Sequence, residues 1–198
     1  MLAIKQLVVH STFDQGPFPA RNLHNYYHLS DCLSIYHDSE RSIPWRPGIL
    51  RPFKEFIEIK GLKKGDQVVY YGVPGTCTPF VELLGFAIRS LELEQVFVPM
   101  VDESKAQRIE HVPDIGMQAR VASVALKPKA VVVMGGLSMP NVPVKAEQMK
   151  AVIDRHPGAL VIGVCCMHML EKAEWLTTIS FDCLIDANID PVEVTRKS

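Results

Sequence analysis

The stretch QVVYYGVPGTCTPF, residues 67–80, decides the fold of this chain. It begins with a β-branched and aromatic run from Val68 to Tyr71, which is typical of a buried strand. The run stops at Gly72, and an apolar segment with helical character starts at Pro79. A strand, a glycine-bearing turn and a helix N-terminus in this order aim free N–H groups and the positive end of the helix dipole at one crevice. The stretch therefore predicts an α/β protein with an anion site.

Further apolar strands are expected outward from this stretch. Besides 67–73, the pattern predicts strands at 95–98, 130–134, 160–164 and 183–185. Continuous apolar strands that alternate with helices are typical of a parallel sheet covered on both faces. We therefore predict a doubly wound fold, Rossmann-like or flavodoxin-like, with a five-stranded parallel sheet in three α/β/α layers. The strand orders 3-2-1-4-5 and 2-1-3-4-5 both fit, and the first is preferred.

Helices are expected between these strands. Apolar spacing predicts a helix that begins near Ile49 and ends before Gly61, and Pro52 is tolerable in its first turn. The later expected helices are 79–91, 144–156 and 168–177, and the less regular segments 102–109 and 117–126 can also be helical, with a break at 112–116.

Composition indicates one soluble globular domain. The 198 residues are 47% hydrophobic and 22% charged, with a formal net charge of -1. Such a balance does not support nucleic-acid binding, and no apolar run approaches the roughly 20 residues that span a bilayer. Five cysteines without framework spacing fit a reducing cytoplasm. We expect a cytoplasmic α/β domain at 47–198, with no membrane or nucleic-acid partner, preceded by an irregular N-terminal arm at 1–46.

Small polar residues and glycines follow the carboxyl ends of the predicted strands, where ligands bind in open α/β sheets. Loops are commonly polar and glycine-rich without any ligand, so a structural interpretation stays open. The loop lacks the G-x-G-x-x-G fingerprint and the P-loop lysine, so the cofactor is unknown. The expected partner is a small anionic molecule, such as a nucleotide or a phosphorylated cofactor. The candidate ligand-binding residues are Gly72, Gly75, Thr76, Thr78, Gly135, Gly136, Ser138 and Asn141.

Cys77 and His168 are the candidate catalytic residues. The helix dipole favours the thiolate of a cysteine beside a helix N-terminus, although a small residue in a tight turn can also be purely structural. His168 could act as a base or a ligand, or simply as a polar group in a first helical turn. Thr78 before Pro79 is predicted to be the N-cap of the helix.

Two other functions stay open. Cys77, Cys165 and His168, with Cys166 or Cys183, could form a soft metal or iron–sulfur site, although the sequence has no CxxC pair. Asp186, Asn188 and Asp190 could hold a hard cation or simply end the last strand. Alternatively, the protein is a non-catalytic interaction module, whose helices 79–91 and 168–177 mediate oligomerisation, for example as a homodimer. No metal ligand is assigned.

Three segments resemble a family of uncharacterised archaeal proteins found mainly in methanogens. They are LRPFKEFIEIKGLKKGDQVVYYGVPGTCTPFVELLGFAIR, VVVMGGLSMPNVPV, and VIGVCCMHMLEKAEWL with FDCLIDANIDPVEV, so the match runs from about Leu50 to Val194. The strings GVPGTCTPF and MGGLSMPN are unusual and make the match specific. The resemblance implies an archaeal, cytoplasmic α/β protein, without an assigned activity or catalytic residue. Residues 1–46 are not part of it.

Overall fold

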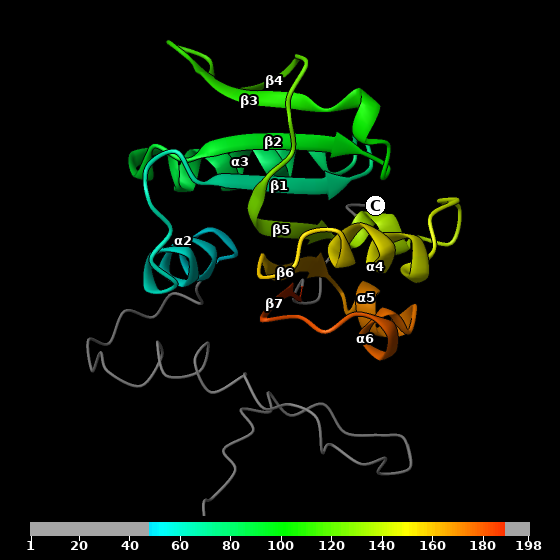
Figure 1. Ribbon diagram of the computed structural model, residues 1–198. Coiled ribbons are helices and arrows are strands. Elements are labelled where there is room, and N and C mark those ends of the chain that lie inside the picture. Colours follow the sequence, from blue (N-terminus) through cyan, green and yellow to red (C-terminus); the bar gives the residue numbers. More distant parts are fainter. Residues whose placement is uncertain (1–47, 189–198) are drawn as a thin grey trace, which may run out of the picture.

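The computed structural model describes residues 48–188 and shows a mixed α/β protein with a seven-stranded, mostly parallel sheet (Figure 1). The sheet order is β4-β3-β2-β1-β5-β6-β7. The strands are β1 Gln67–Gly72, β2 Glu94–Pro99, β3 Gln107–Val112, β4 Gly116–Val121, β5 Pro128–Met134, β6 Leu160–Cys166 and β7 Cys183–Ala187. The α/β class is confirmed, but a sheet of five strands was too small. The predicted arm at 1–46 lies outside the described residues.

All five predicted strands are present, and each pairs in parallel with its neighbour. Their order is 2-1-3-4-5, so the preferred order 3-2-1-4-5 was wrong. That order would have placed β5 at an edge, whereas Ala130–Met134 is buried throughout and lies beside β1. From β1 the chain moves to β2 on one side, and from β5 it moves to β6 and β7 on the other. The direction therefore reverses between β1 and β5, whose carboxyl ends are neighbours.

The segments 102–109 and 117–126, expected to be helical, contain a β-hairpin instead. A short 3-10 turn at Glu103–Lys105 leads into β3, which pairs antiparallel with β2 and β4. The hairpin turn has positive φ at Asp114 and Gly116. In β3 only Ile109 is buried, and in β4 only Met117 is buried. The sequence of the hairpin therefore shows no clear alternation of apolar and polar residues.

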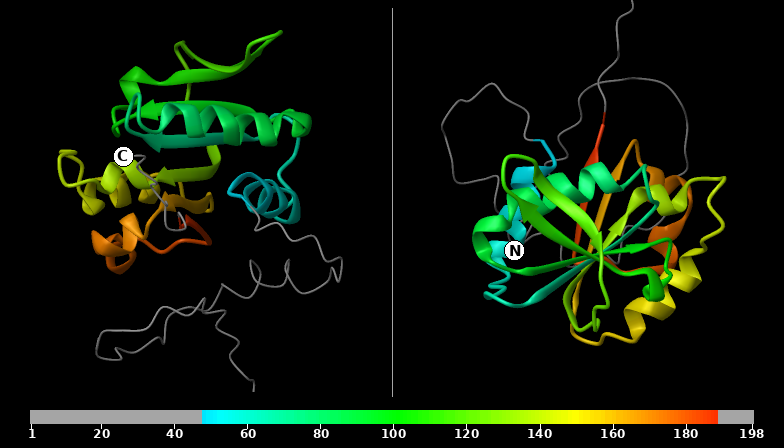
Figure 2. Two further views of the ribbon diagram at one scale, coloured as in Figure 1. Left: turned by 180° about the vertical axis from the view of Figure 1, so that it is seen from behind. Right: turned by 90° about the horizontal axis from the view of Figure 1, so that it is seen from above.

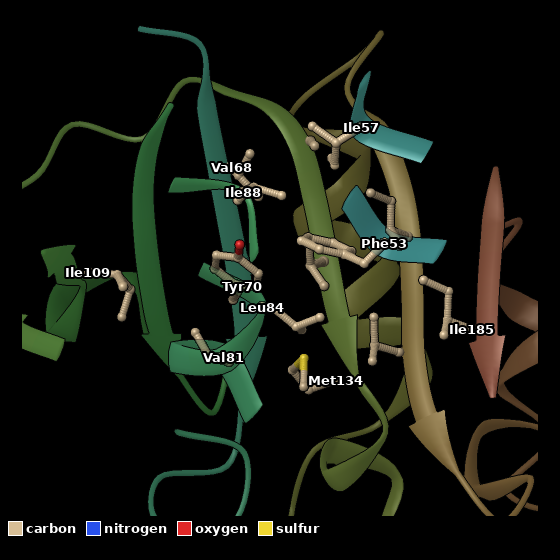
Figure 3. Close-up of a cluster of buried hydrophobic side chains, with 14 of the residues drawn as sticks. Phe53, Ile57, Val68, Tyr70, Val81, Leu84, Ile88, Ile109, Met134 and Ile185 are labelled. Atoms are coloured by element: carbon tan, nitrogen blue, oxygen red, sulfur yellow. The ribbon is translucent and has the colours of Figure 1, made fainter. Parts of the chain in front are cut away.

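Helices cover both faces of the sheet (Figure 2). Val68 and Tyr70 pack with α2 Leu50–Ile59 and α3 Thr78–Ala87 on one face, as Figure 3 shows. The alternate residues Val69 and Tyr71 pack on the other face with helices that follow β5 and β6. This division follows from the alternation of side chains along a strand. The second group of helices is α4 Ala146–Asp154, α5 Met169–Lys172 and α6 Trp175–Thr178.

The predicted helix 168–177 is divided into α5 and α6 at Glu174, whose φ is 61°. Leu170 and Trp175 are both buried against the sheet. In a continuous helix, residues five positions apart point in directions about 140° apart. The break therefore allows both side chains to face the core. Within residues 48–188, no helix has the length and apolar character needed to cross a membrane.

Candidate functional site

The loop after β1 is a tight turn that feeds α3. Gly75 has a φ of +77° and open space around its Cα, so its conformation is one that glycine adopts without strain. The N–H of Gly75 donates to Thr78 Oγ1 at 3.2 Å, and the N–H of Cys77 donates to the Val73 carbonyl at 2.8 Å. The helix begins at Thr78, and Cys77 is the N-cap. Thr78 was wrongly predicted as N-cap, because Cys77 is already helical at φ −90° and ψ −25°.

Cys77 points into the protein and is only 3% exposed. Burial raises the pKa of its thiol, and the N–H groups of Val73 and Gly136 oppose this shift only in part. The helix dipole was expected to lower the pKa of Cys77, but burial raises it. Cys77 is therefore a thiol at neutral pH. A Cβ atom at Gly136 would lie 2.5 Å from the Cys77 sulfur, and one at Gly72 would lie 2.7 Å from the Cys77 Cβ. Both glycines make room for this cysteine.

The short 3-10 helix η3, Gly135–Ser138, follows β5 and lies between the β1 loop and the end of β6. A Cβ atom at Gly135 would lie 2.9 Å from the Cα of Cys165 and 3.3 Å from Met169 Cε. Ser138 donates its hydroxyl to the Gly135 carbonyl at 2.8 Å, and Asn141 is exposed. The structure thus brings Gly72, Thr76, Cys77 and Gly136 together at the carboxyl ends of β1 and β5.

His168 lies in a turn held by Asp186. Met167 and His168 are consecutive residues with positive φ, 56° and 59°. The Asp186 carboxylate accepts hydrogen bonds from the His168 N–H at 3.1 Å to both oxygens and from Cys165 Sγ at 3.3 Å. The His168 Nδ1 atom is 2.5 Å from Asp186 Oδ2. This contact was not predicted from the sequence, because it depends on the β6–β7 register that pairs Cys165 with Asp186.

The cysteines at the end of β6 are also protonated. Burial raises the pKa of Cys165 to about 12, and Asp186 contributes to the shift. Burial and Asp186 raise the pKa of Cys166 as well. Within residues 48–188, no three His, Cys, Asp or Glu side chains form a group that could hold a metal ion. Cys77, Cys165 and His168 are therefore not assembled as metal ligands there. Asn188 is exposed, and Asp190 lies outside the described residues.

Three N–H groups at the start of α3 are open. In the part of the chain that the structure describes, Thr76, Thr78 and Phe80 donate no backbone hydrogen bond. The first N–H groups of a helix have no partner within the helix, so they are available to solvent or a ligand. Thr76 and Phe80 are exposed, and Thr78 is half-buried. These groups lie at the carboxyl end of β1, next to the point where the strand order reverses.

Comparison with known proteins places this mixed α/β chain in a family. Residues 46–190 match the family described as "Uncharacterized protein conserved in archaea (DUF2124)", and the chain belongs to it. An uncharacterised protein of Methanothermobacter thermautotrophicus is 33% identical over 144 residues, which cover 71% of this chain and 92% of that protein. An uncharacterised protein of Methanocaldococcus jannaschii is 37% identical over 141 residues, covering 71% and 84%. The resemblance to archaeal, mainly methanogen, proteins is thereby confirmed.

A solved structure is similar as well. It is a crystal structure of a protein of unknown function from Methanothermobacter thermautotrophicus. It matches with a TM-score of 0.65 and 29% sequence identity, covering 80% of this chain and 99% of that chain.

Proposed function

We propose that this protein binds a small anionic molecule at the carboxyl ends of β1 and β5. The observation that carries the proposal is the set of open N–H groups of Thr76, Thr78 and Phe80 at the start of α3. We treat the five parallel strands as a doubly wound unit inside the larger sheet. In such units, ligands bind where the strand order reverses. We also propose a cytoplasmic location, since the cysteine usage suits a reducing compartment.

The chemistry of the loop suits a phosphate or a carboxylate. Backbone N–H groups and the dipole of a ten-residue helix favour negative charge at its N-terminus. Hydrogen bonds to a charged group contribute about 1.5–3 kcal/mol each. The loop carries no lysine or arginine, so the N–H groups and the threonine hydroxyls would provide the contacts. Three such bonds at the low end of this range, about 4.5 kcal/mol together, correspond to a Kd for inorganic phosphate of about 0.5 mM.

The alternatives have less support. The described residues do not gather a metal-ligand group. Self-association through α3 has one supporting observation, since Phe80, Leu83 and Phe86 are 41%, 49% and 40% exposed on that helix.

Titration of ¹⁵N-labelled protein with sodium phosphate, at ionic strength held constant with sodium chloride, tests anion binding. We expect the amide resonances of Thr76, Thr78 and Phe80 to shift along one common binding curve. Shifts that are absent from these amides, or spread evenly over the surface, would refute the site.

A pair of glycine variants provides the matched control. Gly75 and Gly65 both have positive φ, +77° and +85°, with open space around the Cα, but Gly65 lies in the turn before β1. Gly75→Ala and Gly65→Ala should therefore destabilise the fold by a similar amount, about 1 kcal/mol. Only Gly75→Ala should weaken phosphate binding, by about tenfold. Equal affinities for the two variants would contradict the proposal.

A further inference from the structure

The Asp186 carboxylate fixes the imidazole of His168 in one orientation. Both carboxylate oxygens accept from the backbone N–H of His168, and Oδ2 also contacts Nδ1 of the ring. Asp186 is itself 16% exposed at its side chain, whereas the His168 side chain is 48% exposed. Because the carboxylate accepts the Nδ1 proton, the neutral ring carries its lone pair on Nε2. The two ring nitrogens point in diverging directions, so Nε2 faces away from Asp186 and β7.

The turn that carries His168 follows β6, two strands away from the β1 loop that carries the open N–H groups. Gly136 is packed against Cys77 and Thr76, and the adjacent Gly135 is packed against Cys165 and Met169. The β1 loop and the His168 turn therefore flank the same two glycines. Cys166 is also close enough to Cys77 to contribute to the raised pKa of the Cys77 thiol. Only β5 separates β1 from β6, so the carboxyl ends of these two strands are about 10 Å apart.

We propose that His168 is a general base, positioned by Asp186, that activates water to hydrolyse a small ester whose anionic group binds at Thr76, Thr78 and Phe80. The anion site is the one proposed above, so the substrate class rests on that proposed function. The separation of about 10 Å between the two strand ends suits a substrate with its charge and its ester at opposite ends. The imidazole is 48% exposed, whereas the thiols of Cys77 and Cys165 are buried.

The reaction needs only water and the ester. His168 Nε2 takes a proton from water while the water oxygen bonds to the carbonyl carbon. The bond between this carbon and the leaving oxygen then breaks, and the imidazolium returns its proton to that oxygen. The products are a carboxylic acid and an alcohol, and no group is oxidised or reduced. Asp186 stabilises the positive charge on the ring between the two proton transfers, so it is a positioning residue.

Two carboxylates contact the His168 ring at Nδ1. One is Asp186 on β7, and the other is Glu171 on α5, whose Oε2 is 3.6 Å from Nδ1. Cys165 on β6 donates to the same Asp186 carboxylate. Because both carboxylates contact Nδ1, neither occupies Nε2, the nitrogen that would take the proton from water.

Two matched esters test the proposal on the full chain. The first is 4-acetoxybenzoate, whose carboxylate and acetyl ester lie at opposite ends of a rigid ring, and the second is its neutral methyl ester. We expect hydrolysis above the buffer rate, with KM lower for the anionic ester. His168→Asn should reduce kcat about a hundredfold, the low end of what a general base contributes. Asparagine tolerates the positive φ at this position, so the variant should fold.

Asp186→Asn should reduce kcat about tenfold and leave KM unchanged, because Asp186 contacts the imidazole and not the substrate. A merely structural role for Asp186 would not lower kcat at an unchanged KM. His111→Asn and His156→Asn are the controls, since both histidines lie away from this turn and should keep the wild-type rate. Folding of every variant is checked by circular dichroism.

The outcomes separate this proposal from the anion site. Wild-type rates equal to the buffer rate, or a His168→Asn variant as active as the wild type, would overturn the general base. If that happens while phosphate still shifts the amides at the start of α3, the anion site stands alone. If both esters are hydrolysed with equal KM through His168 and phosphate shifts nothing, the general base stands and the anion site fails.

Discussion

Strands β1 and β3 belong to one sheet, with only β2 between them, but they differ in burial. All six residues of β1 are buried, because helices cover both faces of the sheet there. In β3 only Ile109 is buried, and it packs in the cluster that includes α3. A strand with helices on both faces of the sheet has a continuous apolar sequence. A strand near the edge of the sheet with a helix on one face has few apolar residues. The sequence of a strand therefore reflects the layers that cover it.

The largest expected effect comes from truncating one buried side chain in the parallel strands, which we compare with a truncation in the β3–β4 hairpin. Ile162 in β6 is fully buried, and Ile162→Ala should destabilise the protein by about 2–5 kcal/mol through lost burial and the cavity left behind. Ile109→Ala should fall at or below the low end of that range, because the hairpin is covered on one face and can relax. Urea unfolding followed by circular dichroism measures both.

Ile115→Ala is the control for these truncations. Ile115 is 69% exposed in the hairpin turn, and the change should stay within about 0.5 kcal/mol. A cost at Ile109 equal to or greater than the cost at Ile162 would break the comparison between the two regions.

The same difference explains what the sequence could predict. The runs at 68–71 and 130–134 are apolar at every position, so both strands and their parallel direction were predictable. Their pairing with each other was not, because the preferred order placed the second run beside β2. The hairpin was not, because Ile109 and Met117 become buried only once α3 lies over them. The order of the strands depends on which neighbour covers the edges of β5, and spacing along the chain does not contain that information.

The candidate site was predictable in place but not in detail. The loop at 72–78 lies at a strand end and a helix start, as its residues indicate. The inward direction of Cys77 depends on the close approach of Gly136, which lies in η3 after β5, more than fifty residues later in the sequence. The contact between His168 and Asp186 likewise depends on the pairing of β6 with β7. Tertiary packing decides both, and local pattern decides neither.

Hydrogen exchange sharpens the comparison at an intermediate scale. The amides of β1 and β5 lie in the centre of the sheet and should exchange only through global unfolding. The amides of β4 lie at the edge and should exchange through local opening, with a free energy several kcal/mol smaller. Native-state exchange measured by NMR in low urea gives both values. Equal exchange free energies in β1 and β4 would show that the hairpin is part of the same cooperative unit.

The smallest expected effect is a loss of stability at alkaline pH that originates in the parallel region. Burial raises the pKa of Cys165 from its ordinary value of 9.0 to about 12. In the folded protein the thiol keeps its proton, while the unfolded chain loses it near pH 9, so rising pH favours unfolding. This stabilisation is complete below pH 9 and disappears progressively as the pH approaches 12. Between pH 8.0 and 9.5, below the ionisation of tyrosine, we expect a loss of about 0.5–1 kcal/mol.

Urea unfolding at four pH values in this range measures the slope of stability against pH. Cys165→Ala should reduce the slope, and the thiols of Cys77 and Cys166, whose pKa values burial also raises, should account for what remains. Ile109→Val in the hairpin lowers stability without changing a titratable group, so it should leave the slope as it is. A Cys165→Ala variant with the wild-type slope would place the alkaline sensitivity elsewhere.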